Sequence, residues 1–155
     1  MNDENNYLSK EKFDELTTEL EHLKTVRRRE IAEQLEYARS LGDLSENAEY
    51  EEARNLQAAT EDRIRIIEES LSHARIIEHN KGNTVSLGNT VTIQKQGEKD
   101  EHSYIIVGSA EANMHEHKIS HLSPLGSALM DKKKGDTFTF ETPKGVQKYK
   151  IINIK

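Results

Sequence analysis

Apolar residues recur every three or four positions through the first part of the chain. They are Phe13, Leu16, Leu20 and Leu23, followed less regularly by Val26, Ile31, Leu35 and Ala38. Such steps place side chains on one stripe of an α-helix, and a stripe this narrow is typical of a coiled-coil seam. Ser9 is a suitable N-cap, and neither proline nor glycine interrupts residues 8–41. The pattern therefore predicts one long helix that ends at Gly42.

A second apolar stripe follows within a few residues. Its members are Leu56, Thr60, Ile64, Ile67, Leu71 and Ala74. Because the connection is short, the two helices are expected to be antiparallel neighbours. No third long amphipathic segment is available to close a bundle, so residues 1–78 are predicted to form a projecting coiled-coil hairpin with its tip at 42–47. Residues 1–7 are expected to carry no regular element.

The hydrophobic pattern changes after residues 79–83, where turn-forming residues cluster and the helical period stops. Short β-branched and aromatic runs then predict strands at 91–93, 104–107, 137–141 and 146–154. Ser123 before Pro124 is typical of a helix start and predicts a short helix to about Lys132. The predicted fold class is α+β: a coiled-coil hairpin, a linker at 79–83, and a small antiparallel α+β domain over 84–155.

Charge is divided unevenly between these two parts. Residues 1–78 hold 11 Lys and Arg against 20 Asp and Glu, whereas residues 79–155 hold 11 against 8. A chain with a net charge of −6 is a poor general binder of nucleic acid, because phosphate contact depends on cationic side chains. If the protein acts near nucleic acid, a protein partner is expected to bring it there.

Other features of the composition exclude several classes of function. The chain has no cysteine, which excludes disulfides and thiolate metal sites. No apolar run approaches the ~20 residues of a membrane span, so we expect no membrane partner and a cytoplasmic location. No nucleophile–base set and no phosphate-binding loop is present, which argues against an independent hydrolase.

Two carboxylates, Asp43 and Glu46, follow Gly42 at the predicted tip. One interpretation is a capping box, in which Asp43 accepts a hydrogen bond from the N–H of residue 46 and Glu46 reaches back. The other is a divalent-ion site, because Mg²⁺ prefers oxygen ligands and is held by one or two carboxylates together with a substrate or partner. The two interpretations are compatible, and spacing alone does not separate them.

The tip sequence Leu-Gly-Asp-Leu-Ser-Glu-Asn-Ala-Glu-Tyr, residues 41–50, closely resembles the signature of the bacterial Gre family of transcript cleavage factors. Leu44 directly after the aspartate is similar to the GreA type within this family. The resemblance extends to residues 29–32, to the second apolar stripe, and to residues 123–129 followed by Gly-Asp at 135–136. Two further glutamates beside the tip, at 51–52, depart from the pattern and add negative charge there.

This resemblance implies an FKBP-like fold for the C-terminal domain, which would dock at the rim of the RNA polymerase secondary channel while the hairpin enters it. Asp43 and Glu46 would be the catalytic residues, and would hold Mg²⁺ jointly with the polymerase active site rather than tightly alone. The polymerase's own endonucleolytic cleavage of the extruded RNA 3′ end would be stimulated, which rescues backtracked or arrested complexes. The protein itself would be no stand-alone enzyme, and we expect a monomer.

Four residues near the tip are candidates for contact with RNA or polymerase: Ser45, Asn47, Tyr50 and Arg39. Each has a structural alternative, namely turn formation for the two small polar residues and packing for the tyrosine. Arg27, Arg28, Arg29 and Arg39 would either guide extruded RNA or pair with glutamates at helical spacing.

Two alternative functions remain open. A non-catalytic channel-binding regulator that inhibits RNA polymerase would keep its activity after Asp43→Asn. A coiled-coil interaction module, whose acidic residues only cap a helix, would show no effect on transcription at all.

His115 and His117 would share one face of a strand and suggest zinc, but no cysteine or firmly spaced acidic residue completes such a site.

Overall fold

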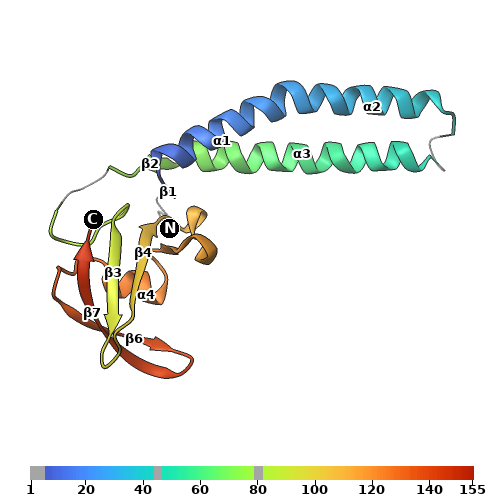
Figure 1. Ribbon diagram of the computed structural model, residues 1–155. Coiled ribbons are helices and arrows are strands. Elements are labelled where there is room, and N and C mark those ends of the chain that lie inside the picture. The colour runs from blue at the N-terminus through green and yellow to red at the C-terminus, as the bar shows by residue number, and fades with distance from the viewer. Residues whose placement is uncertain (1–5, 44–46, 79–81) are drawn as a thin grey trace. The chain divides into compact units, whose positions relative to one another are not determined.

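The computed structural model describes residues 6–43, 47–78 and 82–155 (Figure 1). The chain divides into two compact units, one of Phe13–His73 and the other of Met1–Lys12 together with Ala74–Lys155. Most of the expected linker, residues 79–81, lies outside the described residues. No helix in the described ranges is long and apolar enough to cross a membrane.

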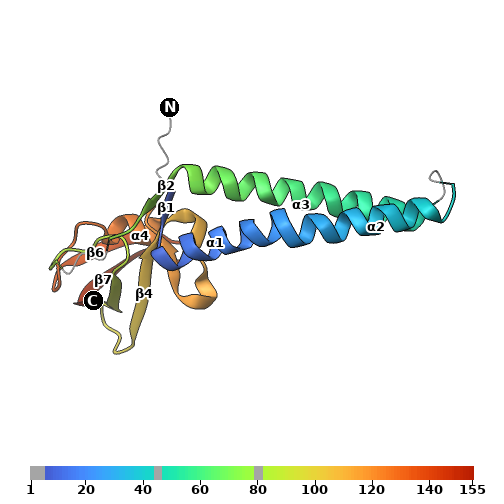
Figure 2. The ribbon, with the colours of Figure 1, turned by 90° about the horizontal axis from the view of Figure 1, so that it is seen from above.

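The first unit is a helical hairpin (Figures 1 and 2). One continuous helical segment contains α1 (Lys10–His22), a π-helical turn (Leu23–Arg27) and α2 (Arg28–Ser40), and α3 (Ala48–Ser72) returns beside it. The buried residues along the seam are Leu16, Ile31, Leu35 and Ala38 on one side, and Ala53, Thr60, Ile64 and Ile67 on the other. The predicted coiled-coil hairpin is therefore confirmed.

The π-helical turn explains why the first apolar stripe is irregular. Leu16 and Leu23 are seven positions apart, as are Ile31 and Ala38, but Leu23 and Ile31 are eight apart. A π turn closes with i→i+5 hydrogen bonds and so holds one residue more than an α turn. The turn accommodates the additional residue. As a result, the apolar residues before the turn and those after it both face α3.

The two ends of the long helical segment follow the sequence prediction. Ser9 Oγ accepts a hydrogen bond from the N–H of Lys12 at 3.1 Å, as expected of an N-cap. At the other end Leu41 is the C-cap, and Gly42 follows with a φ of +117°. Glycine adopts this left-handed conformation without strain, which ends α2 at the predicted place.

The second unit contains a five-stranded sheet in the order β5-β4-β3-β7-β6. Its strands are β3 (Thr90–Lys95), β4 (Glu101–Val107), β5 (Lys118–Ser120), β6 (Thr137–Thr142) and β7 (Gly145–Ile154). Three neighbouring pairs are antiparallel, but β4 and β5 are parallel. The expectation of a purely antiparallel domain is wrong at this pair, because the chain crosses over through 3₁₀ turns at Ser109–Glu111 and Met114–Glu116 before β5 begins.

One hydrophobic cluster holds this sheet and its helix together. Its buried members are Val85, Val91, Ile93, Ile106, Ile119, Leu129, Phe138 and Ile151. Helix α4 (Pro124–Leu129) contributes Leu129 and begins as predicted, because Ser123 Oγ accepts the N–H of Gly126 at 3.0 Å. The helix ends before the predicted Lys132, since Met130 is extended and Asp131 takes a left-handed φ of +64°.

Two short strands that the sequence did not predict join the chain's beginning to this unit. β1 (Asn6–Leu8) pairs in parallel with β2 (Ala74–Ile76), so Ala74 belongs to a strand and not to the helical stripe. Ser9 donates from its N–H and its hydroxyl to the Glu111 carboxylate, at 2.8 and 2.7 Å. A Cβ at Gly108 would lie 2.0 Å from the backbone oxygen of Tyr7, so this close approach requires glycine.

Candidate functional site

The described part of the hairpin tip begins where α2 ends. The N–H of Leu41 donates to the carbonyl of Ala38 at 3.2 Å, and the N–H of Gly42 donates to the carbonyl of Arg39 at 3.4 Å. Asp43 follows directly and is exposed to solvent. The structure thus places one predicted site carboxylate on the surface at the end of the hairpin. Glu46 and Ser45 lie outside the described residues.

Asn47 starts α3 and also ties the two helices together. Its Oδ1 accepts the N–H of Tyr50 at 3.1 Å, and its Nδ2 donates to the carbonyl of Ala38 on α2. Helix α3 begins at Ala48 with Asn47 as its N-cap. The predicted hydrogen bond between Asp43 and residue 46 lies outside the described residues and stays a prediction. Both polar groups of the Asn47 amide are used inside the hairpin, and its contact with RNA or polymerase stays a prediction.

Tyr50 lies half-buried against the seam near the tip. It packs on the cluster of Ile31, Leu35 and Ala53. The guanidinium carbon of Arg39 lies 6.0 Å from the centroid of the Tyr50 ring, at the limit of a cation–π contact. The ring therefore supports an exposed arginine from the opposite helix. Direct contact of either residue with a partner stays a prediction.

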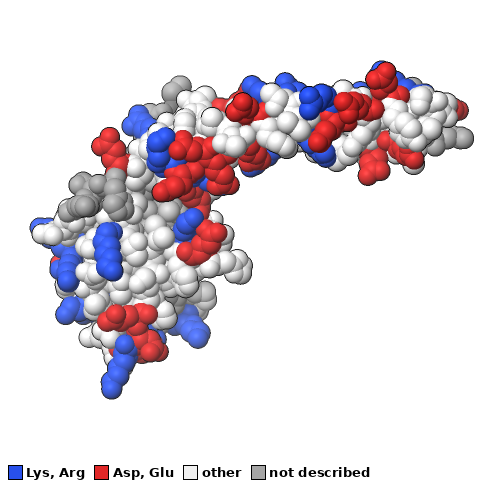
Figure 3. Space-filling view, turned by 45° about the horizontal axis from the view of Figure 1, so that its top comes forward, with Lys and Arg blue, Asp and Glu red and all other residues white. Residues whose placement is uncertain are grey.

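Charged side chains of both signs alternate along the hairpin (Figure 3). Ion pairs that cross from the first helical segment to α3 include Lys24 with Glu68, Arg28 with Glu61, and Glu19 with Arg63. The Arg28–Glu61 pair is bidentate at 2.8 and 2.8 Å, and this hydrogen bonding raises the pKa of Arg28 and lowers the pKa of Glu61. Because these pairs are exposed, each contributes little to the stability of the hairpin.

The four arginines proposed to guide RNA fall into two groups. Arg27 pairs with Glu30 at 3.1 Å, as the helical-spacing alternative predicts, whereas Arg28 pairs with Glu61 across the hairpin and not at helical spacing. Arg29 and Arg39 form no ion pair with any residue in the described ranges. Of the four, these two keep a guanidinium that a partner could use.

The histidine hypothesis fails on backbone geometry. His115 lies in the 3₁₀ turn Met114–Glu116, and His117 follows it with a left-handed φ of 54°. The two side chains therefore do not share a strand face. Among the described residues no group of three or more His, Cys, Asp or Glu is gathered as a metal site.

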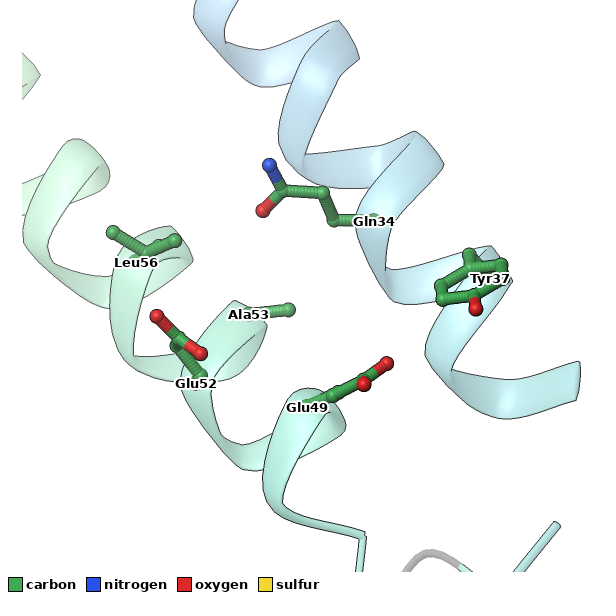
Figure 4. Close-up of a pocket in the computed structure, with 6 residues that line it drawn as sticks. All are labelled: Gln34, Tyr37, Glu49, Glu52, Ala53 and Leu56. Carbon is green, nitrogen blue, oxygen red and sulfur yellow. The ribbon is translucent and has the colours of Figure 1, made fainter. Parts of the chain in front are cut away.

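Sequence reasoning missed a hollow on one flank of the tip, between α2 and α3. It is lined by Gln34, Tyr37, Glu49, Glu52, Ala53 and Leu56 (Figure 4). The only signal in the sequence is helical spacing. Positions 34, 37, 49 and 52 each come directly before a residue that packs in or beside the seam, so each pair lies along one side of its helix. That spacing does not show that the two rows meet.

Comparison with known proteins identifies the family. A family model described as "Transcription elongation factor, N-terminal" matches residues 6–76, and one described as "Transcription elongation factor, GreA/GreB, C-term" matches residues 79–155. Proteins named transcription elongation factor GreA are similar along almost the whole chain. The one from Thermoanaerobacter pseudethanolicus is 47% identical over 96% of both chains, and that from Roseiflexus castenholzii is 45% identical over 100% of both.

A solved structure of GreA factor homolog 1 from Thermus thermophilus is also similar. It is 30% identical, with 96% of this chain and 97% of that chain covered, and its TM-score is 0.43. At that TM-score the assignment rests on the sequence matches. By those matches, which together span nearly all its residues, the chain belongs to the GreA/GreB family of transcription elongation factors.

Proposed function

We propose that this protein binds RNA polymerase through its secondary channel and stimulates the polymerase's own cleavage of the extruded RNA 3′ end. Family membership supports the setting in transcription elongation. The observation that carries the cleavage role is Asp43, an exposed carboxylate at the end of the hairpin. The N-cap of α3 is Asn47.

The hairpin is suited to deliver a carboxylate into a narrow passage. From Lys10 to Ser40 the helical segment is roughly 45 Å long at ~1.5 Å per residue. Its two helices are tied by the seam, by ion pairs along the stalk, and by Asn47 at the tip. Two helices held in this way lose little further conformational freedom when they meet a partner, which favours accurate placement of Asp43 at the end of α2.

Asp43 and Glu46 would contribute oxygen ligands to Mg²⁺ at the polymerase active site. The ion, when bound there, would activate the attacking water and stabilise charge on the reacting phosphate. Asp43 would complete a site that the polymerase mainly provides, because one or two carboxylates hold Mg²⁺ only together with a substrate or partner. Arg39 would face RNA phosphate or a polymerase carboxylate, with Tyr50 holding it in place. Ser45 and Asn47 remain contact candidates in this proposal.

The test is RNA cleavage in halted, backtracked RNA polymerase complexes with Mg²⁺. Asp43→Asn should lower the stimulated cleavage rate by roughly 100-fold, as expected when one charge-stabilising group near a transition state is lost. Glu51→Gln is the matched control, because it removes another exposed carboxylate from the first turn of α3. The control should cleave like the unaltered protein, and all three should bind polymerase.

A different result would favour the alternative function. If the unaltered protein and Asp43→Asn both bind and slow elongation without cleavage, the protein is a channel-binding regulator that inhibits polymerase. If neither variant nor the unaltered protein changes transcription, the hairpin is an interaction module.

A further inference from the structure

The hollow on the flank of the tip takes no part in the proposed cleavage chemistry. Its volume is about 260 Å³, and its walls come from Gln34 and Tyr37 on α2 and from Glu49 and Glu52 on α3 (Figure 4). Pockets for small molecules usually measure about 300–1,000 Å³ and bury most of the ligand. This open hollow, which we call the acidic groove, is therefore suited to one protruding side chain rather than to a cofactor.

The lining of the acidic groove combines three kinds of surface. Ala53 is buried and Leu56 is half-buried, so its floor is aliphatic. Tyr37 forms one wall with 61% of its surface exposed, a large exposed area for an aromatic side chain. Glu49 and Glu52 are exposed, and neither forms an ion pair with any residue in the described ranges. In Figure 4 Glu49 points from α3 toward the Tyr37 side.

These surfaces are complementary to an arginine side chain. Its aliphatic stem would lie on Leu56 and Ala53, and its planar guanidinium would stack on the Tyr37 ring. The guanidinium N–H groups would donate to the Glu49 carboxylate in charge-assisted hydrogen bonds. Glu52, which lies beside Leu56 in Figure 4, would add negative charge at the other end of the groove. Gln34, which reaches from α2 toward α3 in Figure 4, would supply a carbonyl acceptor at the edge.

Other ligands fit the acidic groove less well. Nucleic acid would bring phosphate toward two carboxylates and be repelled. Mg²⁺ requires about six oxygen ligands, whereas Tyr37, Ala53 and Leu56 line much of the wall and offer no carboxylate.

The opposite flank of the tip has the reverse character. Arg39 lies there over Tyr50, and Arg54, one helical turn after Tyr50 on α3, is on the same side. The hairpin end is thus cationic on one flank and anionic on the other. A partner that binds both flanks would accept the hairpin in only one orientation about its long axis.

We propose that the acidic groove binds an arginine side chain from the wall of the RNA polymerase secondary channel, and thereby fixes the direction in which Asp43 points. The identity of the partner rests on the proposed function above. The role of the groove is positioning and affinity, and no group in it touches the reacting atoms.

The first test is the affinity of the full chain for purified core RNA polymerase, measured by fluorescence anisotropy at two salt concentrations. The double variant Glu49→Gln with Glu52→Gln should bind about 10-fold more weakly. In this variant the guanidinium of the partner's arginine has no carboxylate in the groove to pair with. Its control is Glu33→Gln with Glu51→Gln, which removes the same charge from two exposed glutamates outside the groove. The control should stay within about 2-fold of the unaltered protein, and its salt dependence should be unchanged.

A second pair of variants examines the aromatic wall. Tyr37→Ala should weaken binding about 5-fold, whereas Tyr37→Phe keeps the ring face and should bind like the unaltered protein. Tyr37 is exposed, so neither change should lower the melting temperature of the hairpin.

The outcomes separate this proposal from the proposed function. If the groove variant binds polymerase as tightly as its control, the proposed role of the acidic groove in binding is overturned, whatever the cleavage rate. If the unaltered protein binds and the groove variant does not, but neither stimulates cleavage, the groove is supported and the cleavage role fails. If the unaltered protein does not bind polymerase, both are overturned.

Discussion

The hairpin and the sheet-containing unit bury their apolar side chains in different ways. In the second unit, strands and α4 surround one cluster that includes Ile93, Ile106 and Ile151. In the hairpin each helix buries a single stripe against the other, so most of its side chains face solvent. The same chain thus combines a unit whose core is packed from several directions with a hairpin that exposes most of its polar and charged side chains. The fold of the hairpin therefore depends on few of its residues.

The largest effect on stability should come from the cluster of the second unit. Ile106→Ala should lower the free energy of unfolding of that unit by about 2–5 kcal/mol, since Ile106 is fully buried. Ile67→Ala in the seam should cost the hairpin only about 2 kcal/mol, because two helices can close on the space more easily than a sheet. Hydrogen exchange followed by mass spectrometry measures both units separately. Equal losses would contradict this contrast between the two units.

A deletion can test whether the π-helical turn only absorbs an additional residue. Deletion of Arg27 places Leu23, Val26 and Ile31 at steps of three and four, as in a regular coiled coil. We expect an α-helix through this region, with a melting temperature within about 2 °C of the unaltered hairpin. Circular dichroism measures both quantities.

The control for this deletion removes a residue from the regular part of the stripe. Deletion of Glu21 places Leu20 and Leu23 two positions apart and turns one of them out of the seam. The melting temperature should then fall by about 5 °C or more. If the deletion of Arg27 is equally damaging, the π turn has a role beyond register.

The smallest effect should come from the exposed pair of Arg28 and Glu61. The hydrogen bond from Arg28 lowers the pKa of Glu61 below its ordinary value of 4.5. Because the folded pKa is the lower one, the pair stabilises the hairpin above about pH 4.5 and loses this contribution as the pH falls further. Glu61→Gln should lower the melting temperature by about 1–2 °C at pH 7, and by progressively less as the pH falls below about 4.5. A difference that stays constant as the pH falls would indicate lost packing instead.

Local sequence was sufficient for the parts whose structure depends on neighbouring residues. The helical stripes, Ser9 and Ser123 as N-caps, and Gly42 as the end of α2 all follow from spacing and backbone preference. The tip motif also indicates the family to which the chain belongs, and Asp43 lies exposed as a tip residue should.

Contacts between distant residues could not be derived in this way. The parallel pairs β1–β2 and β4–β5 involve β1, β2 and β5, which are three-residue segments with little strand pattern in their own sequences. Asn47 is a candidate for turn formation by its residue type, but its bond to Ala38 on α2 exists only when both helices are in place. The partner of Arg28 is Glu61 on α3, not one of the nearby glutamates, because a coiled coil brings the flanks of two helices together.

By itself the sequence determined the hairpin, its family and the carboxylate at its tip, because helix periodicity, caps and a long motif are local properties of the chain. Only the tertiary structure decided which sides of α2 and α3 face each other near the tip, and hence that Tyr37, Glu49 and Glu52 line one groove. The register of two helices depends on the fit of all their seam residues at once, and the π turn shifts the residues after it by one position. This register cannot be read from any short stretch of sequence.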